Sequence, residues 1–258
     1  MKKIVHVLVI FFGLLFSLSS FAAAVIETLN GPVRAGASAA AATAVAVGQR
    51  LNSGSVVVTG PKALVTMRFD DGQVVALHEN TEFKVAEYSF SKDHPAKDKY
   101  VFELVKGAMR SITALLTNRN RQAYALRTPA ATIGIRGTDF MVAVVNPAYM
   151  SVLNGTIAVG NTAGTVTFGV GATATAASAA TLASAIAASA LPASVAAAFS
   201  QLGSLTIAAG AAGAVGTAAG GVTPAAVAAG VAAAAAVAAA ASGGGGAAGT
   251  TGTTGTAQ

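Results

Sequence analysis

The distribution of charge constrains this chain more than any other feature. Apart from two lysines near the N-terminus, every charged residue lies between Glu27 and Asp139, and no charged residue of either sign follows. The end of this uncharged run is dominated by Ala, Gly and Thr. The surface of an ordinary soluble domain carries charge throughout. The pattern therefore predicts one conventional domain over residues 25–170, followed by segments of a different physical kind.

Short strand-like runs fill this domain. The clearest is a hairpin at Ala63–Leu77, in which apolar residues alternate on both sides of an Asp71-Gly72 turn. Gly107 and an Asn154-Gly155 pair between apolar runs are further turn signals. Because the strands are short and closely spaced, and none alternates with a long helix, the expected fold is all-β. We predict a sandwich or roll of short antiparallel strands.

The N-terminus has the organisation of a secretory signal peptide over residues 1–24. Two lysines precede an apolar run, and small residues follow it. The triplets Ser20-Phe21-Ala22 and Ala22-Ala23-Ala24 both fit a cleavage site, so the mature chain is expected to begin near Ala23 or Val25. The apolar core is short for a membrane span of about 20 residues, and the chain has no Cys for lipid attachment. The sequence thus predicts an exported protein of the periplasm or cell surface.

Beyond residue 170 the chain is expected to be helical and then disordered. Residues 171–220 contain two stretches of helical composition, Thr175–Ala190 and Pro192–Leu202. Residues 221–241 are almost wholly Ala and Val, and residues 242–258 are Gly/Thr-rich and predicted to be disordered. Two interpretations of 221–241 are open. Ala is the best helix former, which favours a helix-prone or self-associating tail, whereas the length also fits a membrane anchor.

The charged residues give little support to catalysis. The sequence has no Cys and only three His, and its carboxylates lack ligand spacing, so no metal and no cofactor is expected. Neighbouring carboxylates on an extended strand point apart, and Asp-Gly is turn chemistry. We therefore expect no enzyme and no catalytic residue. The alternative, a glycan- or lipid-modifying enzyme, requires two of six carboxylates to converge in a cleft: Asp70, Asp71, Glu79, Glu82, Glu87 and Glu103.

A basic cluster in the middle of the chain is the candidate partner-binding surface. Its members are Arg110, Arg119, Arg121, Tyr124 and Arg127. The cluster suits an envelope protein or an anionic envelope polymer. Nucleic acid is a poor partner, because the chain is predicted to be exported and its net charge is small. The alternative interpretation is a solvated loop with scattered charges.

A run from Arg127 to Phe140 combines Pro, Gly and Arg in a strand-like setting. Pro129 favours extended geometry in the preceding residue, and the glycines permit positive φ. Arg136 has two open interpretations: a partner-binding group, or a buried or half-buried Arg that ties a turn to backbone carbonyls or to a carboxylate such as Asp139. We expect the motif to be structural. Its defining residues are Thr128, Pro129, Gly134, Arg136, Gly137, Thr138 and Phe140.

This run resembles the T-P-x-A-x-x-x-x-R-G-T-x-F signature of FecR-like periplasmic domains. Further pieces stand in the family's order, among them F-D-D-G-Q-V-V-A-L at Phe69–Leu77, L-V-K-G-A-M-R at Leu104–Arg110 and a final V-L-N-G-T-I-A-V. The resemblance covers about residues 27–160. It implies a periplasmic β domain, whose best-known relatives relay the occupancy of an outer-membrane receptor to a cytoplasmic sigma factor.

A predicted signal peptide in place of a cytoplasmic segment departs from that sigma-regulating plan. The resemblance therefore implies a stand-alone interaction or sensing module of the cell envelope. A third reading is a self-assembling envelope or matrix protein that associates through its Ala/Gly-rich tail.

Overall fold

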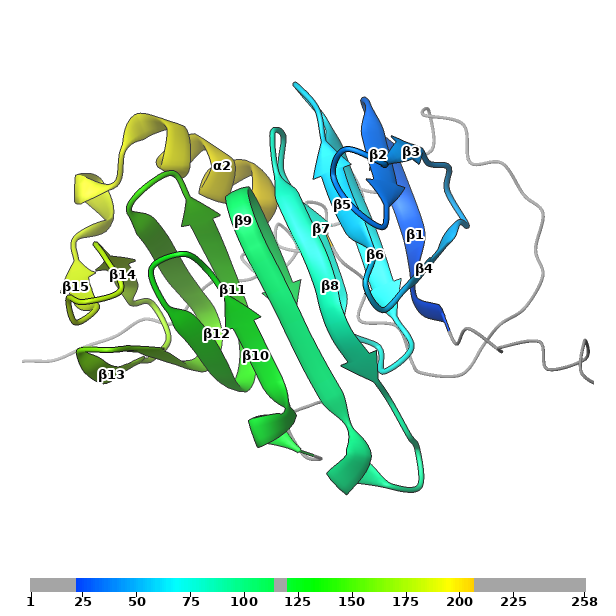
Figure 1. Cartoon of the computed structure of the whole chain (residues 1–258). Coiled ribbons are helices and arrows are strands. Elements are labelled where there is room, and N and C mark those ends of the chain that lie inside the picture. The colour runs from blue at the N-terminus through cyan, green and yellow to red at the C-terminus, as the bar shows by residue number, and fades with distance from the viewer. Residues whose placement is uncertain (1–21, 114–119, 207–258) are drawn as a thin grey trace, which may run out of the picture. The chain divides into compact units, whose positions relative to one another are not determined.

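The computed structural model describes residues 22–113 and 120–206 (Figure 1). Its strands belong to one 15-stranded sheet, and the all-β prediction is confirmed. The first strands are β1 (Ala22–Asn30), β2 (Val33–Gly36), β3 (Thr43–Ala44), β4 (Arg50–Asn52), β5 (Val56–Thr59), β6 (Leu64–Phe69), β7 (Val74–Leu77) and β8 (Glu82–Ser89). The later strands are β9 (Lys99–Ile112), β10 (Tyr124–Arg127), β11 (Thr132–Val144), β12 (Ala148–Asn161), β13 (Gly164–Phe168), β14 (Thr173–Ala176) and β15 (Ser184–Ile186). The helices are α2 (Ala193–Gly203) and the short 3-10 turns η1 (Pro95–Lys97), η3 (Arg121–Ala123) and η4 (Ala188–Ala190).

The sheet is organised around β9. The first half of this strand pairs antiparallel with β8 and parallel with β10, and its second half pairs antiparallel with β7 and β11. The change of partners occurs at Gly107, whose φ is +88°. A Cβ atom on Gly107 would lie 2.5 Å from the Cα of Thr81. The expected turn at Gly107 is therefore wrong: glycine lets the strand bend past Thr81, but the chain does not reverse.

The two branches of the sheet fold over a common core. One branch runs from β9 through β8, β5 and β2 to β3, and the other through β7, β6 and β1 to β4. Phe102 of β9 contacts a ring from each branch, with centroids 5.1 Å from Phe69 and 5.6 Å from Phe83. All three rings are at most 2% exposed. Burial of one such side chain contributes roughly 1.5–3 kcal/mol, so this aromatic cluster holds the branches together.

The hairpin at Asp71-Gly72 is confirmed, because β6 and β7 pair across it and Gly72 has a φ of +86°. The expected turn at Asn154-Gly155 is wrong. This pair lies inside the continuous strand β12, opposite a bulge of β11. A Cβ atom on Gly155 would lie 1.9 Å from the carbonyl oxygen of Gly137. The glycines thus allow two backbones to approach closely, while both flanking runs keep pairing with β11.

The helix prediction for Thr175–Ala190 is also wrong. The segment contains the end of β14, then β15 and η4, because β14 pairs with the first residues of β12. This pairing overrides the helical propensity of Ala. The helix expected at Pro192–Leu202 is confirmed as α2, which packs Val195, Phe199 and Leu202 onto the outer face of β9 and β11.

Several predicted segments lie outside the described residues. They are most of the signal peptide (1–24), the end of the segment 171–220, the helix candidate 221–241 and the tail 242–258. Within residues 22–113 and 120–206, no helix has the length and apolar character required to cross a membrane.

Candidate functional site

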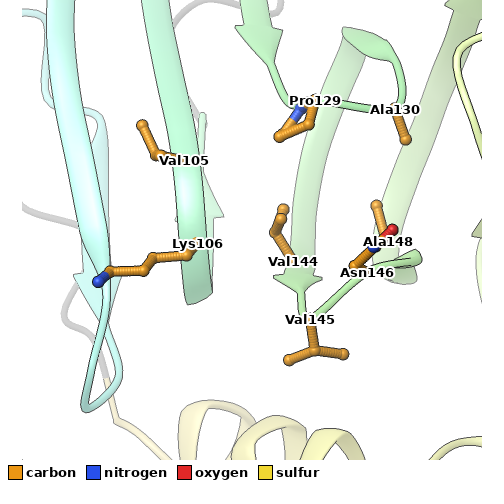
Figure 2. Close-up of a pocket in the computed structure, with 8 residues that line it drawn as sticks. All are labelled: Val105, Lys106, Pro129, Ala130, Val144, Val145, Asn146 and Ala148. Carbon is orange, nitrogen blue, oxygen red and sulfur yellow. The ribbon is translucent and has the colours of Figure 1, made fainter.

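A pocket of about 460 Å³ opens where the middle of β9, the end of β11 and the start of β12 meet the turn between β10 and β11 (Figure 2). The turn supplies two lining residues, the β11–β12 connection supplies two, the adjoining ends of β11 and β12 supply one each, and β9 closes the opposite side with two. The lining residues are Val105, Lys106, Pro129, Ala130, Val144, Val145, Asn146 and Ala148. Most of these side chains are apolar, so the pocket suits an apolar group.

Two large apolar side chains stand exposed at this pocket. Val105 is 44% exposed and Val145 is 50% exposed, whereas Ala130 and Ala148 are buried. In Figure 2 the side chain of Lys106 extends away from the other lining residues, so its ammonium group does not fill the pocket. The amide of Asn146 is the polar group beside Ala148 and Val144 in this view.

Hydrogen bonds within the motif fix the turn that lines the pocket. The N–H of Thr128 donates to the carbonyl oxygen of Ala131 at 2.9 Å. The N–H of Ala131 donates to Oγ1 of Thr128 at 3.1 Å, and this hydroxyl donates to the Ala131 carbonyl at 2.8 Å. Pro129 stands at the corner, where it needs no donor of its own. Thr128 and Pro129 therefore shape the fold, and Pro129 also forms a wall of the pocket.

A second, smaller hollow of about 240 Å³ lies between the sheet and α2. It shares Val145 with the larger pocket and includes Ala108, Val195 and Ala198. At this place Nε2 of His78 lies 2.9 Å from Oε1 of Gln201 in α2. Neither hollow can be predicted from the sequence, because their residues come from segments that are distant along the chain.

Arg110 is a structural residue rather than a partner-binding one. Its guanidinium group donates two hydrogen bonds to Asp139, at 2.9 and 2.7 Å. Nη1 also donates to the carbonyl oxygens of Leu202, Gly203 and Leu205, at 2.9, 3.3 and 3.1 Å. These carbonyls lie at the C-terminal end of α2, where helical partners are lacking. Arg110 is only 9% exposed, so it caps the helix from inside the fold.

The other members of the basic cluster do not form a described surface with Arg110. Tyr124 is buried, contacts Phe102 at 5.7 Å between ring centroids, and has a pKa raised by burial. Arg127 is exposed, with Nη1 3.9 Å from Glu103. Arg119 lies outside the described residues, and only the backbone of Arg121, in η3, is described. Tyr124 is therefore a core residue, in contrast to its predicted place on a binding surface.

The remaining motif residues lie in β11, and Gly137 and Thr138 fall within its bulge opposite β12. Thr138 is buried, and its N–H donates to Oγ1 of Thr113 at 3.1 Å, while its carbonyl accepts from Thr113 at 2.9 Å. Phe140 is fully buried, Gly134 lies within β11, and Gly137 has a φ of +58°.

Arg136 is exposed and pairs in register with Thr156. The interpretation of Arg136 as a buried or half-buried residue is therefore wrong. The contacts expected of it, with backbone carbonyls and with Asp139, belong to Arg110.

The six candidate carboxylates occupy different surroundings. Burial raises the pKa of Asp71 to about 6, opposed by hydrogen bonds from Gln73 and Tyr88. Asp71 is 1% exposed, while the adjacent Asp70 is exposed. A pKa near 6 suits a general acid or base, but the carboxyl of Asp71 lies within the fold.

Glu87 and Glu103 lie 3.2 and 3.6 Å from lysines, at Lys99 and Lys84. Glu79 accepts a hydrogen bond from the backbone N–H of Lys62, and Glu82 pairs in register with Lys106. Within the described part of the chain, no three His, Asp or Glu side chains cluster as metal ligands would.

Comparisons with known proteins agree with the motif. The model of the family described as FecR protein matches residues 55–158. A comparison with curated proteins found no match.

Two crystal structures of a protein described as a "putative anti-sigma factor from Parabacteroides distasonis ATCC 8503" are similar to this chain. Each is 16% identical with a TM-score of 0.37, and the similarity covers 46% of this chain and 53% of that one. This chain thus spans about half the length of that protein. The matched segment runs from β5 into β12, and the chain therefore carries a FecR domain.

Proposed function

We propose that this chain is an exported, non-enzymatic sensing module of the cell envelope. A FecR domain is consistent with a regulatory or sensing role. We further propose that the pocket beside Pro129 receives an aliphatic side chain from a protein partner. The observation that carries this proposal is an apolar pocket with two exposed valines, built in part by the family's own Thr-Pro turn.

The lining of the pocket favours a protein segment over a small charged ligand. Its volume of about 460 Å³ lies in the range of small-molecule pockets, so there is ample room for an aliphatic side chain. Removal of an aliphatic side chain from water contributes about 25 cal/mol for each Å² of apolar surface buried. The amide of Asn146 provides a hydrogen-bonding group for the partner's backbone, and the ammonium of Lys106, outside the pocket, favours an acidic neighbour.

The proposal that the chain is exported rests on its first residues and not on the pocket. The two lysines, the apolar run and the small residues before Val25 form a signal peptide. After cleavage, the FecR domain would lie in the periplasm or at the cell surface, where an envelope protein is the expected partner. The exposed Arg127, together with Arg119 and Arg121 of the basic cluster, is a candidate for electrostatic steering of that partner.

A peptide selection tests this function. Random peptides displayed on phage are selected against the purified chain from Ala23 to Gln258, and the enriched peptides are expected to share an aliphatic residue. Val145→Asp should weaken their binding about tenfold or more, because it places a charge in the apolar pocket. Val47→Asp is the matched control, since Val47 is 61% exposed in a loop between β3 and β4.

Thermal melting of both variants verifies that they fold. Selected peptides that bind the Val145→Asp and Val47→Asp variants equally well would refute the pocket as the binding site. Failure to enrich any aliphatic peptide would refute the proposed ligand class.

A further inference from the structure

We propose that a second copy of this chain pairs with the free edge of β13. This surface is separate from the pocket of the proposed function, because β13 lies along the last residues of β12 and the pocket lies at its first. Among the described residues, β13 pairs with β12 alone, so its other edge has no strand partner (Figure 1). Unpaired strand edges are templates for further strand pairing.

The register determines which groups of β13 face this edge. Asn161 pairs with Gly164 across the two-residue turn Thr162-Ala163. The pair that closes such a turn exchanges hydrogen bonds, and every second pair along the ladder does the same. The backbone N–H and C=O groups of Val166 and Phe168 therefore form hydrogen bonds with β12. It follows that the N–H and C=O groups of Thr165 and Thr167 point away from β12, toward the free edge.

The sequence of the edge is symmetric. An antiparallel copy related by a two-fold axis at Val166 places each Thr165 opposite Thr167 of the partner subunit. This register makes both threonine pairs hydrogen-bonded and the central valine pair non-hydrogen-bonded, which is the alternation that an antiparallel ladder requires. Cross-strand threonine pairs are favourable. A two-fold interface must match itself, and this edge does.

Exposed apolar side chains flank both ends of β13. At the Gly164 end, a Cβ atom on the glycine would lie 3.0 Å from Leu182, which is 48% exposed. At the Phe168 end, Val170 is 68% exposed and Leu153 is 38% exposed. The backbone of Gly171 donates to the Val152 carbonyl at 2.8 Å, which brings Val170 next to Leu153. The two-fold arrangement brings Leu182 of each copy toward Val170 of the other.

The charge distribution also favours a second copy. Edge strands are commonly guarded by Lys, by Pro or by a bulge, and the segment G-T-V-T-F of β13 has no Lys and no Pro. No charged residue follows Asp139, so two positively charged chains can meet here without placing like charges opposite each other. Because this surface is neutral, it does not attract an acidic or a basic partner. Shape and backbone pairing therefore determine what binds at this edge.

Cysteine cross-linking tests the register directly, because the chain has no Cys of its own. Thr165→Cys and Thr167→Cys variants of the chain from Ala23 to Gln258 are mixed and oxidised with diamide. The mixture is expected to form a disulfide-linked dimer, since the two sulfurs face each other in the proposed pair. Each variant alone should not, because its Cα atoms lie beyond the roughly 4.4–6.8 Å that a disulfide tolerates. Equal cross-linking in all three samples would overturn the register.

The oligomeric state tests the interface without new covalent bonds. Sedimentation of the unmodified chain is expected to show a monomer–dimer equilibrium. Thr167→Lys should raise the protein concentration at the midpoint of this equilibrium about tenfold or more, because a lysine on an edge strand hinders pairing with another strand. Thr132→Lys is the control, since Thr132 is exposed in β11, inside the sheet. A monomer at all concentrations, or a dimer equally sensitive to both variants, would overturn the proposal.

Discussion

Arg110 joins three parts of the fold through one guanidinium group. It extends from β9, donates two hydrogen bonds to Asp139 of β11 and donates others to carbonyl oxygens at the C-terminal end of α2. The planar fork of Arg has enough donors for both tasks, whereas Lys does not. A guanidinium in this place therefore couples the position of the helix to the register of the two central strands.

Replacement of Arg110 by Ala should lower the free energy of unfolding by about 3 kcal/mol. The substitution leaves Asp139, whose side chain is only 20% exposed, without its ion pair and leaves the end of α2 without its cap. Urea unfolding followed by circular dichroism measures the loss. Arg127→Ala is the matched control, because that exposed pair with Glu103 should contribute less than about 1 kcal/mol. Similar losses in the two variants would contradict the structural role of Arg110.

Asp71 should make stability depend on pH. Burial raises its pKa from 3.8 to about 6, so the folded state binds the proton more tightly than the unfolded state. The stabilising effect of this group is complete below about pH 4 and is lost as the pH rises through 6. At about 1.4 kcal/mol per pKa unit, this difference in pKa between the folded and unfolded states corresponds to roughly 3 kcal/mol of stability.

Asp71→Asn removes this titration. The free energy of unfolding of the variant, relative to the unmodified chain, should therefore increase between pH 4 and pH 7. Guanidinium unfolding at each pH gives the difference between the two proteins. A difference that stays constant across this range would show that Asp71 does not titrate there.

Some of these residue roles can be read from the sequence and others cannot. The Asp71-Gly72 turn is a local signal, so the sequence alone predicts it. Which Arg binds Asp139 cannot be read from local sequence. Arg136 is closer along the chain, but it is exposed on β11. Arg110 comes from β9, which pairs with β11. The pocket is hidden for the same reason, since its walls combine segments around residues 105, 130 and 145.

Long bent strands are the elements that local patterns misrepresent. Gly107 and Asn154-Gly155 have the composition of turns, yet β9 and β12 continue through them because glycine allows a bend or a close approach as well as a reversal. The alternation of apolar residues was a sound guide to the strands themselves. The pairing partners on both sides of each glycine decided whether the chain turned.

Gly155 should tolerate substitution far less than a glycine of similar φ in open space. Its φ is +74°, and an added Cβ would lie 1.9 Å from the carbonyl oxygen of Gly137. Gly171 has a φ of +79° with no atom within 4 Å of that position. Gly171→Ala should therefore cost about 1 kcal/mol, the backbone term alone, while Gly155→Ala should cost about 3 kcal/mol or more. Thermal unfolding compares them, and equal costs would contradict the close approach of β11 and β12.

At the scale of the whole molecule, the described sheet extends beyond the FecR match at both ends. The match covers residues 55–158, while β1 to β4 precede it and β13 to α2 follow it. β1 is central to its branch, because it pairs with both β6 and β4. The start of this strand overlaps the predicted cleavage region, so the position of cleavage affects the completeness of the fold.

The buried start of β1 predicts that cleavage follows Ala22 rather than Ala24. Ala23 and Ala24 are 1% and 0% exposed, Ala24 pairs in register with Phe69, and the carbonyl of Ala23 accepts the N–H of Asp70 at 3.3 Å. A chain that begins at Val25 loses these contacts and should be less stable by about 2 kcal/mol.

Export from a bacterial host followed by intact-mass measurement should yield a chain that begins at Ala23. Chains beginning at Ala23 and Val25, purified separately, provide the comparison by thermal unfolding. An exported chain that begins at Val25 and melts at the same temperature as the longer one would show that these two alanines are dispensable to the sheet.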